Sequence, residues 1–111
     1  MVEDCVFCNI VAGNIPSTKV YEDDKVIAFN DIQPIAPIHI LLIPKEHINS
    51  LMELENDELL SHMLKVTKII AKEKGLDEKG FRVLTNIGED GGQAVKHLHF
   101  HILGGTKLPT R

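Results

Sequence analysis

The sequence predicts an α+β domain, in which a mostly antiparallel sheet of about five strands carries one long helix on one face and a short helix at its N-terminal end. Three observations favour this fold class. Short runs of β-favouring residues alternate with polar turns, a single segment has the periodicity of a long amphipathic helix, and the last strand alternates between apolar and histidine positions. At 111 residues, the chain is expected to form one domain over residues 1–111.

The N-terminal half predicts one short helix and three strands. A Gly-Asn pair ends the helix, and a polar Asp-Asp turn joins the first two strands into a hairpin. Two prolines make the connector to the third strand stiff, because each proline fixes φ and removes a hydrogen-bond donor. The predicted elements are a helix over residues 5–12 and strands over residues 19–22, 26–30 and 38–43.

The C-terminal half predicts the long helix and two further strands. Apolar residues recur at three- and four-residue spacing in the helix, Asn56 is suited to cap its N-terminus, and Gly75 is suited to follow its C-terminus. The predicted elements are a helix over residues 56–74 and strands over residues 81–87 and 97–103, the two strands being separated by a glycine-rich turn at 88–92.

Alternation in the last strand divides its residues between two faces. Side chains of a strand point to opposite faces in turn, so the histidines share one face and the apolar residues face the helix. The two sets are His97, His99 and His101, and Leu98, Phe100 and Ile102. His39 joins the histidine face if its strand neighbours the last one. An exposed polar face or a metal-binding cluster would also explain the histidines, but a catalytic surface is the interpretation we favour.

The glycine-rich stretch 88–93 lies just before the histidines. Its glycines permit positive φ and can expose backbone N–H groups, which is typical of a nest that binds anions. Glycines between strands usually only form turns, and this stretch matches neither the dinucleotide-binding pattern nor the P-loop. Its position beside His97 is what favours the anion-binding interpretation.

Cys5 and Cys8 form a C-x-x-C motif at the N-terminus. Zinc requires four ligands in a tetrahedron, so two more must come from elsewhere in the chain. A redox pair is the alternative, but such a pair normally follows a strand in a βαβ pattern. We therefore favour zinc.

Composition excludes several classes of protein. A net charge of −4 and a pI near 5.8 argue against binding of nucleic acid through its phosphates. The acidic N-terminus does not resemble a secretory signal, and no apolar stretch approaches the about 20 residues of a membrane helix. We expect a cytoplasmic protein that does not bind membranes, and we expect a metal, a homodimer or both to reinforce so small a domain.

Three segments resemble a known family. They are PIHILLIPKEH at 37–47, GGQAV at 91–95 and HLHFHIL at 97–103. Together they closely resemble the histidine triad (HIT) family, specifically its Hint branch, and the likeness runs in consistent order from Val6 to Gly105. The resemblance implies a five-stranded antiparallel sheet with a long helix, paired into a homodimer with a continuous larger sheet.

The resemblance also implies an activity, which is hydrolysis of nucleoside 5′-phosphoramidates and related adenylylated compounds to AMP or GMP. His99 would attack the α-phosphorus, His101 would contact the phosphate or leaving group, and His39 would support the imidazoles. Asp31 would bind the ribose. The base pocket would be lined by Val6, Phe7, Phe29 and Ile32, and the sugar and phosphate would be surrounded by Asn86, Gln93, Ala94 and Val95.

In zinc-bearing relatives, the metal is held by the two cysteines, the histidine after the I-P-K-x segment and the first histidine of the triad. The corresponding residues are Cys5, Cys8, His47 and His97. Four ligands leave no open position, so this zinc would be structural. Many Hint proteins have a phosphate-contacting serine where this chain has Ala94, and the tail from residue 106 lacks the tryptophan of some eukaryotic members.

Two other functions stay open at this point. A dinucleoside polyphosphate hydrolase or nucleotidyltransferase of the wider family is the enzymatic alternative, although transferase relatives usually replace the third histidine with glutamine. A non-enzymatic module that senses nucleotides is the other. Turnover of adenylylated substrates distinguishes the enzymes from this module.

Overall fold

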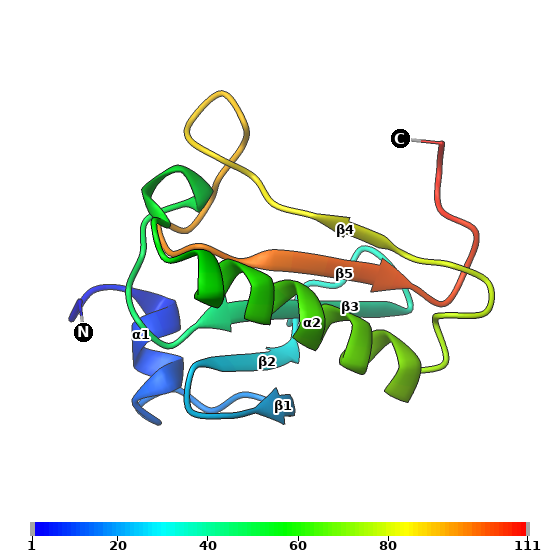
Figure 1. The fold of residues 1–111 in the computed structure, drawn as a ribbon, viewed down its shortest axis with the longest axis horizontal. Helices are drawn as coiled ribbons and strands as arrows, with labels where there is room; N and C mark the ends of the chain where they lie inside the picture. The colour runs from blue at the N-terminus through cyan, green and yellow to red at the C-terminus, as the bar shows by residue number, and fades with distance from the viewer. Residues whose placement is uncertain (1, 111) are drawn as a thin grey trace.

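The computed structural model describes residues 2–110; residues 1 and 111, which the predicted domain over residues 1–111 includes, lie outside the described residues. Two α-helices, five strands and one 3₁₀ helix follow one another along this part of the chain (Figure 1). They are α1 (Val6–Val11), β1 (Lys19–Glu22), β2 (Val26–Asn30), β3 (Ile38–Pro44), η1 (Leu51–Glu53), α2 (Asp57–Glu73), β4 (Arg82–Leu84) and β5 (Phe100–Gly104).

The strands form one antiparallel sheet in the order β1-β2-β3-β5-β4. The register places Ile27 opposite Ile43, and Leu41 opposite His101. The predicted α+β fold class, with a five-stranded antiparallel sheet, one long helix and a short N-terminal helix, is confirmed. Neither α-helix in residues 2–110 is long and apolar enough to cross a membrane.

The long helix α2 forms where the apolar periodicity predicts it. Asn56 caps it, because its side-chain oxygen accepts hydrogen bonds from the N–H groups of Glu58 and Leu59 at 3.0 and 3.1 Å. Beyond the other end, Gly75 adopts a φ of 71°, which favours glycine. The inner face of α2 buries Leu59, Met63, Val66, Thr67, Ile70 and Ala71. Each large aliphatic side chain buried there contributes about 1.5–3 kcal/mol, so packing holds α2 on the sheet.

The two faces of the sheet are covered differently (Figure 1). The face under α2 contributes alternate residues to the main core, namely Val26, Ala28, Ile40, Leu42, Phe100 and Ile102, and Leu98 joins them just before β5. The opposite face packs against α1 through Ile27, Phe29, Leu41 and Ile43. The predicted separation of apolar residues and histidines onto opposite faces is therefore confirmed.

Strands β4 and β5 are both shorter than the sequence predicts. Backbone groups before β5 bond to partners outside the sheet: the Leu98 N–H donates to the Ile48 carbonyl at 2.7 Å. The carbonyl of His99 accepts a hydrogen bond from the Thr85 hydroxyl at 2.8 Å. These bonds replace the strand pairing, while the alternation of side chains continues through residues 97–99.

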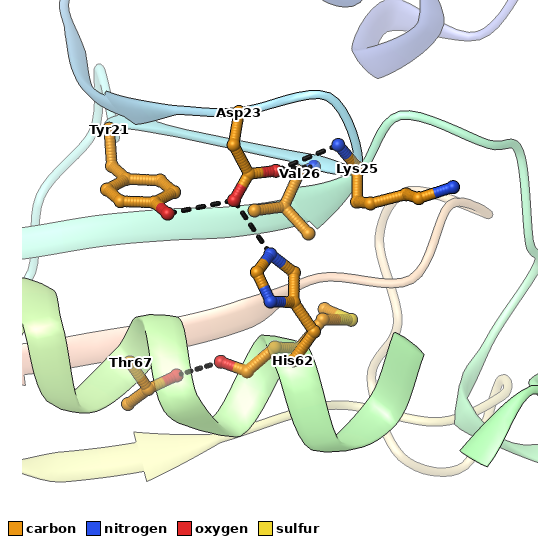
Figure 2. A network of polar contacts seen from close by, with 7 residues as sticks. Tyr21, Asp23, Lys25, Val26, His62 and Thr67 are labelled. Carbon is orange, nitrogen blue, oxygen red and sulfur yellow. Dashed lines mark hydrogen bonds and ion pairs between the residues drawn. The ribbon is translucent and has the colours of Figure 1, made fainter. Parts of the chain in front are cut away.

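Asp23 joins the β1–β2 turn to α2 (Figure 2). Its Oδ1 accepts the N–H groups of Lys25 and Val26 at 2.8 and 2.9 Å, and its Oδ2 accepts the Tyr21 hydroxyl at 2.8 Å and contacts Nε2 of His62 at 2.7 Å. Burial alone would raise the pKa of Asp23, but these hydrogen bonds outweigh it and hold the pKa well below its ordinary value. Asp23 is therefore ionised, and it links the β1–β2 turn to α2 on the face of the sheet that carries this helix.

Candidate functional site

The histidines of the last predicted strand gather on the face opposite α2. The ring centroids of His99 and His101 lie 5.0 Å apart. His39 reaches the same face because β3 pairs directly with β5, and its ring centroid lies 5.2 Å from that of His101. The structure thus brings together the three residues that the sequence predicts to be catalytic.

His99 is held in one tautomer. Its Nδ1 lies 2.7 Å from the backbone carbonyl of His97. A carbonyl only accepts, so Nδ1 carries the proton and donates it, and the lone pair is on Nε2. The ring of Phe7 packs edge-on against the imidazole with centroids 5.1 Å apart, and His99 is only 5% exposed. In its neutral form, this fixed imidazole therefore presents the lone pair of Nε2.

His39 and His101 form a short chain of imidazoles. Nε2 of His39 lies 2.9 Å from Nδ1 of His101 and 3.3 Å from Oδ2 of Asp31. The other ring nitrogen of His39, Nδ1, accepts the N–H of Ile35 at 3.1 Å. Asp31, predicted as the ribose ligand, therefore also contacts a histidine that the sequence predicts to be catalytic.

Burial keeps these two imidazoles neutral at pH 7. It lowers the pKa of His101 to about 4, with smaller contributions in the same direction from His99 and His39 and an opposing one from Asp31. Burial also lowers the pKa of His39, against the carboxylate of Asp31, which raises it. His101 therefore meets a ligand as a neutral hydrogen-bonding group.

A second cluster joins the N-terminal C-x-x-C motif to two histidines. Cys5 caps α1, and its Sγ lies 3.3 Å from Nδ1 of His97. Sγ of Cys8 lies 3.2 Å from Nδ1 of His47 and 3.6 Å from Nδ1 of His97. The four residues that the resemblance implies as zinc ligands thus converge, with ligand atoms within 4.8 Å of one another.

The donor set of this cluster fits a zinc ion. Nε2 of His97 lies 2.8 Å from the Pro44 carbonyl, and Nε2 of His47 lies 2.9 Å from the side-chain oxygen of Asn49. Each Nε2–H donates to its oxygen, which leaves both Nδ1 lone pairs facing the sulfurs. Burial raises the pKa of the Cys5 thiol and lowers the pKa of His97 to about 4, so the His97 imidazole is neutral at pH 7 and its Nδ1 lone pair is free to bind a cation.

Asp31, His39 and His101 also lie close enough to suggest a metal site, but their chemistry differs. Because the Ile35 N–H donates to Nδ1 of His39, the single proton of this neutral imidazole is on Nε2, toward the cluster. A protonated nitrogen cannot ligate a metal. In this cluster Nε2 of His39 carries a proton, whereas in the cysteine cluster Nδ1 of His47 and of His97 each offers a lone pair.

The residues expected to bind the nucleoside fall into four environments. Phe7 and Phe29 are buried and pack edge-on with centroids 5.7 Å apart, whereas Ile32 is 93% exposed. Val6, Ala94 and Val95 line a cavity of about 460 Å³, which also borders the cysteine cluster at Cys5 and His47. Asn86 and Gln93 hydrogen-bond within the 86–95 loop.

The glycine-rich turn is not the open nest that its sequence predicts. The side-chain oxygen of Gln93 accepts the Gly88 N–H at 2.9 Å, the Gln93 N–H donates to the Gly88 carbonyl at 3.0 Å, and the Gly92 N–H donates to the Glu89 carbonyl at 3.0 Å. Gly91 is required by close packing, since a Cβ there would lie 2.3 Å from the Ile87 oxygen. The expectation that this turn directs free N–H groups at an anion is wrong for these amides, which close the turn itself.

Sequence reasoning did not identify which groups fix the imidazoles. They are the carbonyls of Pro44 and His97, the amide of Ile35 and the side chain of Asn49. Only Asn49 carries a signal, as a polar residue two positions after a histidine. Backbone groups are present at every position, so nothing in the sequence marks the other three.

Comparison with known proteins places this chain in a family. The family model described as the HIT domain matches residues 12–108. A histidine triad protein from Clostridium difficile is 57% identical, with a TM-score of 0.95 over 100% of this chain and 98% of that one. A HIT family hydrolase from Clostridium thermocellum is 45% identical, with a TM-score of 0.96 over the same shares. A 14 kDa zinc-binding protein from Brassica juncea is 47% identical over 95% of this chain and 96% of its own length.

Proposed function

The chain belongs to the HIT family, and from that membership and its histidine geometry we propose that it hydrolyses purine nucleoside 5′-phosphoramidates and related adenylylated compounds. The observation that carries the proposal is the 2.7 Å contact between Nδ1 of His99 and the His97 carbonyl. It supports a histidine nucleophile, because it leaves the lone pair on Nε2.

The reaction has two displacements at phosphorus. In the first, the Nε2 lone pair of His99 forms a bond to the α-phosphorus while the P–N bond to the leaving amine breaks and the amine takes up a proton. In the second, water attacks the same phosphorus and releases a proton to solvent, the bond to Nε2 breaks, and a nucleoside monophosphate leaves. Imidazole suits both steps, because it is neutral near pH 7 as a nucleophile and leaves readily once phosphorylated.

Charge that develops on the phosphoryl oxygens needs nearby donors. His101 is suited to this task, because it is neutral and its partner His39 fixes its orientation at 2.9 Å. The N–H groups of Ala94 and Val95 are the backbone donors we assign here, since those of Gly88 and Gln93 close the turn. At residue 94, the alanine side chain leaves only the amide for this role.

The nucleoside is assigned to the segment that precedes β3. We propose that Asp31 binds the ribose hydroxyls and that Ile32 folds over the base, whose pocket includes Val6, Phe7 and Phe29. The large exposed surface of Ile32 supports this assignment, because an apolar side chain 93% exposed gains most from covering a purine. Asn86 and Gln93 support the loop that carries the phosphate contacts.

We propose that the cysteine cluster binds one zinc ion through Cys5, Cys8, His47 and His97. All four positions of a tetrahedral ion are then filled by the protein, so the metal would supply a structural cross-link and no chemistry on the substrate. The cross-link would tie α1 to the segment that carries His97, whose carbonyl holds His99.

We also propose a homodimer. β4 is an edge strand of the sheet, and Val83 on it is 38% exposed. Edge strands expose unpaired backbone groups, and pairing with a second copy would satisfy them in a continuous sheet.

The experiment that tests the activity is a rapid quench with adenosine 5′-phosphoramidate. We expect AMP bound covalently to His99 through an acid-labile bond, identified by mass spectrometry. AMP on His97 or His101 would contradict the mechanism. A substrate panel that includes diadenosine polyphosphates and lysyl-adenylate distinguishes the reactions of the wider family, and AMP binding without any turnover would favour a nucleotide-sensing module instead.

A further inference from the structure

We propose that Asp31 and the backbone amide of Ile35 are positioning groups, which together fix the proton of His39 on Nε2 and so hold His101 as a neutral donor through its own Nε2–H. The positions of the two protons do not depend on any activity, whereas their consequence for turnover rests on the proposed function. The proposal gives Asp31 a second role beside the ribose contact.

The direction of the proton follows from the Ile35 amide. A backbone N–H only donates, so Nδ1 of His39, 3.1 Å away, must accept. A neutral imidazole has one N–H, which is therefore on Nε2. That N–H lies 2.9 Å from Nδ1 of His101, which must accept in turn, and the proton of His101 is left on its Nε2.

Asp31 favours the same tautomer of His39 by acting on its other nitrogen, Nε2. Its Oδ2 lies 3.3 Å from Nε2 of His39, and a carboxylate accepts, so it favours a proton at that nitrogen. Two backbone contacts hold it there: the Gln33 N–H donates to Oδ1 at 2.9 Å, and the Asp31 N–H donates to the His39 carbonyl at 2.9 Å. The opposite tautomer of His39 would set its lone pair against the carboxylate and its proton against the Ile35 N–H.

The end of this chain of hydrogen bonds points to a ligand. Within residues 2–110, Nε2 of His101 is a buried nitrogen that has no hydrogen-bond partner. A buried N–H without an acceptor is unfavourable, so an arriving phosphoryl oxygen is stabilised by the donor that awaits it. The groups that fix this donor lie on the 31–35 segment, which also carries the exposed Ile32. Recognition of the nucleoside and orientation of the phosphate donor therefore share one loop.

The arrangement also limits what His101 does. If His101 gave its Nε2 proton to the leaving amine and took the proton of His39 in exchange, His39 would have no proton on either nitrogen and would be an anion. His101 therefore stabilises charge as a hydrogen-bond donor and keeps its proton. The proton that the leaving amine gains comes from solvent.

The direct test is the tautomer of each histidine, measured by long-range ¹H–¹⁵N correlation NMR on the ¹⁵N-histidine-labelled protein without substrate. We expect a proton on Nε2 of both His39 and His101. Ile35→Pro removes the N–H and should give mixed tautomers at both histidines, whereas the matched Ile35→Ala keeps the N–H, loses only an exposed side chain, and should keep the wild-type tautomers. A proton on Nδ1 of His101 in the wild type, or unchanged tautomers in Ile35→Pro, would overturn the proposal.

Asp31→Asn provides a second variant if Ile35→Pro does not fold. It keeps the shape of the side chain but removes the charge, and it should shift the tautomers in the same way. Its kinetics are measured on adenosine 5′-phosphoramidate and on the 2′,3′-dideoxy analogue, which lacks the ribose hydroxyls. A positioning role lowers kcat on the order of tenfold on both substrates, because the phosphate donor is misplaced. A role limited to the ribose raises KM on the ribose substrate alone and contradicts the proposal.

The NMR and kinetic measurements test the positioning role and the hydrolase function separately. If the wild type turns over neither substrate, the proposed hydrolase function fails, and the NMR spectra still decide whether Asp31 and Ile35 fix the protons of His39 and His101. If the wild type turns over both substrates and the tautomers are not those expected, only the positioning role fails.

Discussion

Replacement of the nucleophile, His99→Ala, should abolish turnover and leave a folded protein that binds AMP. In the structure, the imidazole makes one hydrogen bond to the His97 carbonyl and edge-on contacts with the rings of Phe7 and His101. Loss of the hydrogen bond costs about 1 kcal/mol, and each aromatic contact about 0.5–1.5 kcal/mol. The sum is about 3 kcal/mol, less than the roughly 5–15 kcal/mol that holds a domain folded.

The expected loss of activity is much larger than the loss of stability. Without Nε2 of residue 99 no covalent intermediate forms, so kcat should fall by about 10⁴-fold or more. AMP affinity should change by less than about tenfold, or 1.4 kcal/mol, because the proposed base and ribose contacts come from other residues. Thermal unfolding should occur roughly 10–20 °C lower, still as one transition.

Stopped assays with adenosine 5′-phosphoramidate, AMP titration by calorimetry and thermal unfolding measure the three quantities. Added imidazole offers a control, since it can occupy the space beside Phe7 and restore part of the turnover by attacking phosphorus itself. His101→Ala should be milder, because it removes a donor and not the nucleophile. A His99→Ala protein with turnover near that of the wild type would refute the assignment.

Three further predictions concern the metal, the assembly and acid stability. Protein purified without added zinc or chelator should contain about one zinc per chain by elemental analysis, and Cys8→Ala should lose it and unfold several degrees lower; no metal, or iron in its place, would sink the assignment. Light scattering at micromolar concentration should report twice the 12.4 kDa chain mass, and Val83→Asp on the β4 edge should shift it toward one chain. Because hydrogen bonds hold the pKa of Asp23 below its unfolded value of about 3.9, its contribution to stability is present above that pH and is lost as the pH falls. Asp23→Asn should therefore lower the free energy of unfolding in urea by about 1–2 kcal/mol at pH 7. The free energy of unfolding of this variant should also fall less steeply than that of the wild type between about pH 5 and pH 3. An equally steep fall would contradict the role of ionised Asp23.

The sequence predicted most of the fold because its signals are local. The spacing of apolar residues marks α2, the alternation at 97–102 assigns the two faces of the last segment, and Asn56 marks a helix start. The lengths of β4 and β5 could not be predicted in this way. They depend on the hydroxyl of Thr85 and the carbonyl of Ile48, which bond to the backbone groups of His99 and Leu98 in place of a strand partner.

For the site as well, the residues could be predicted from local signals, but the contacts between distant groups could not. Residue types and their spacing brought forward the cysteines and histidines, since few side chains bind metals or attack phosphorus. The anion-binding role predicted for the glycine-rich turn was wrong for the amides of Gly88, Gly92 and Gln93. Whether the Gly88 amide is free depends on the Gln93 side chain, whose oxygen accepts the Gly88 N–H. Contacts of this kind join a side chain to a backbone group, and composition and spacing carry no record of them.

The two histidine clusters show why backbone contacts decide the chemistry. Both contain imidazoles with reference pKa values of about 6.5. In His97 one nitrogen donates to the Pro44 carbonyl, so the other offers its lone pair to the cysteine sulfurs. In His39 one nitrogen accepts the Ile35 amide, so the other presents a proton. When one nitrogen of a neutral imidazole meets a hydrogen-bond acceptor, its other nitrogen is able to ligate a metal. When one nitrogen meets a donor, its other nitrogen is a hydrogen-bond donor. His97 also connects the clusters, because its carbonyl accepts the Nδ1–H of His99. The lone pair on Nε2 of neutral His99 therefore follows from the same rule that leaves Nδ1 of His97 free for the proposed zinc ion.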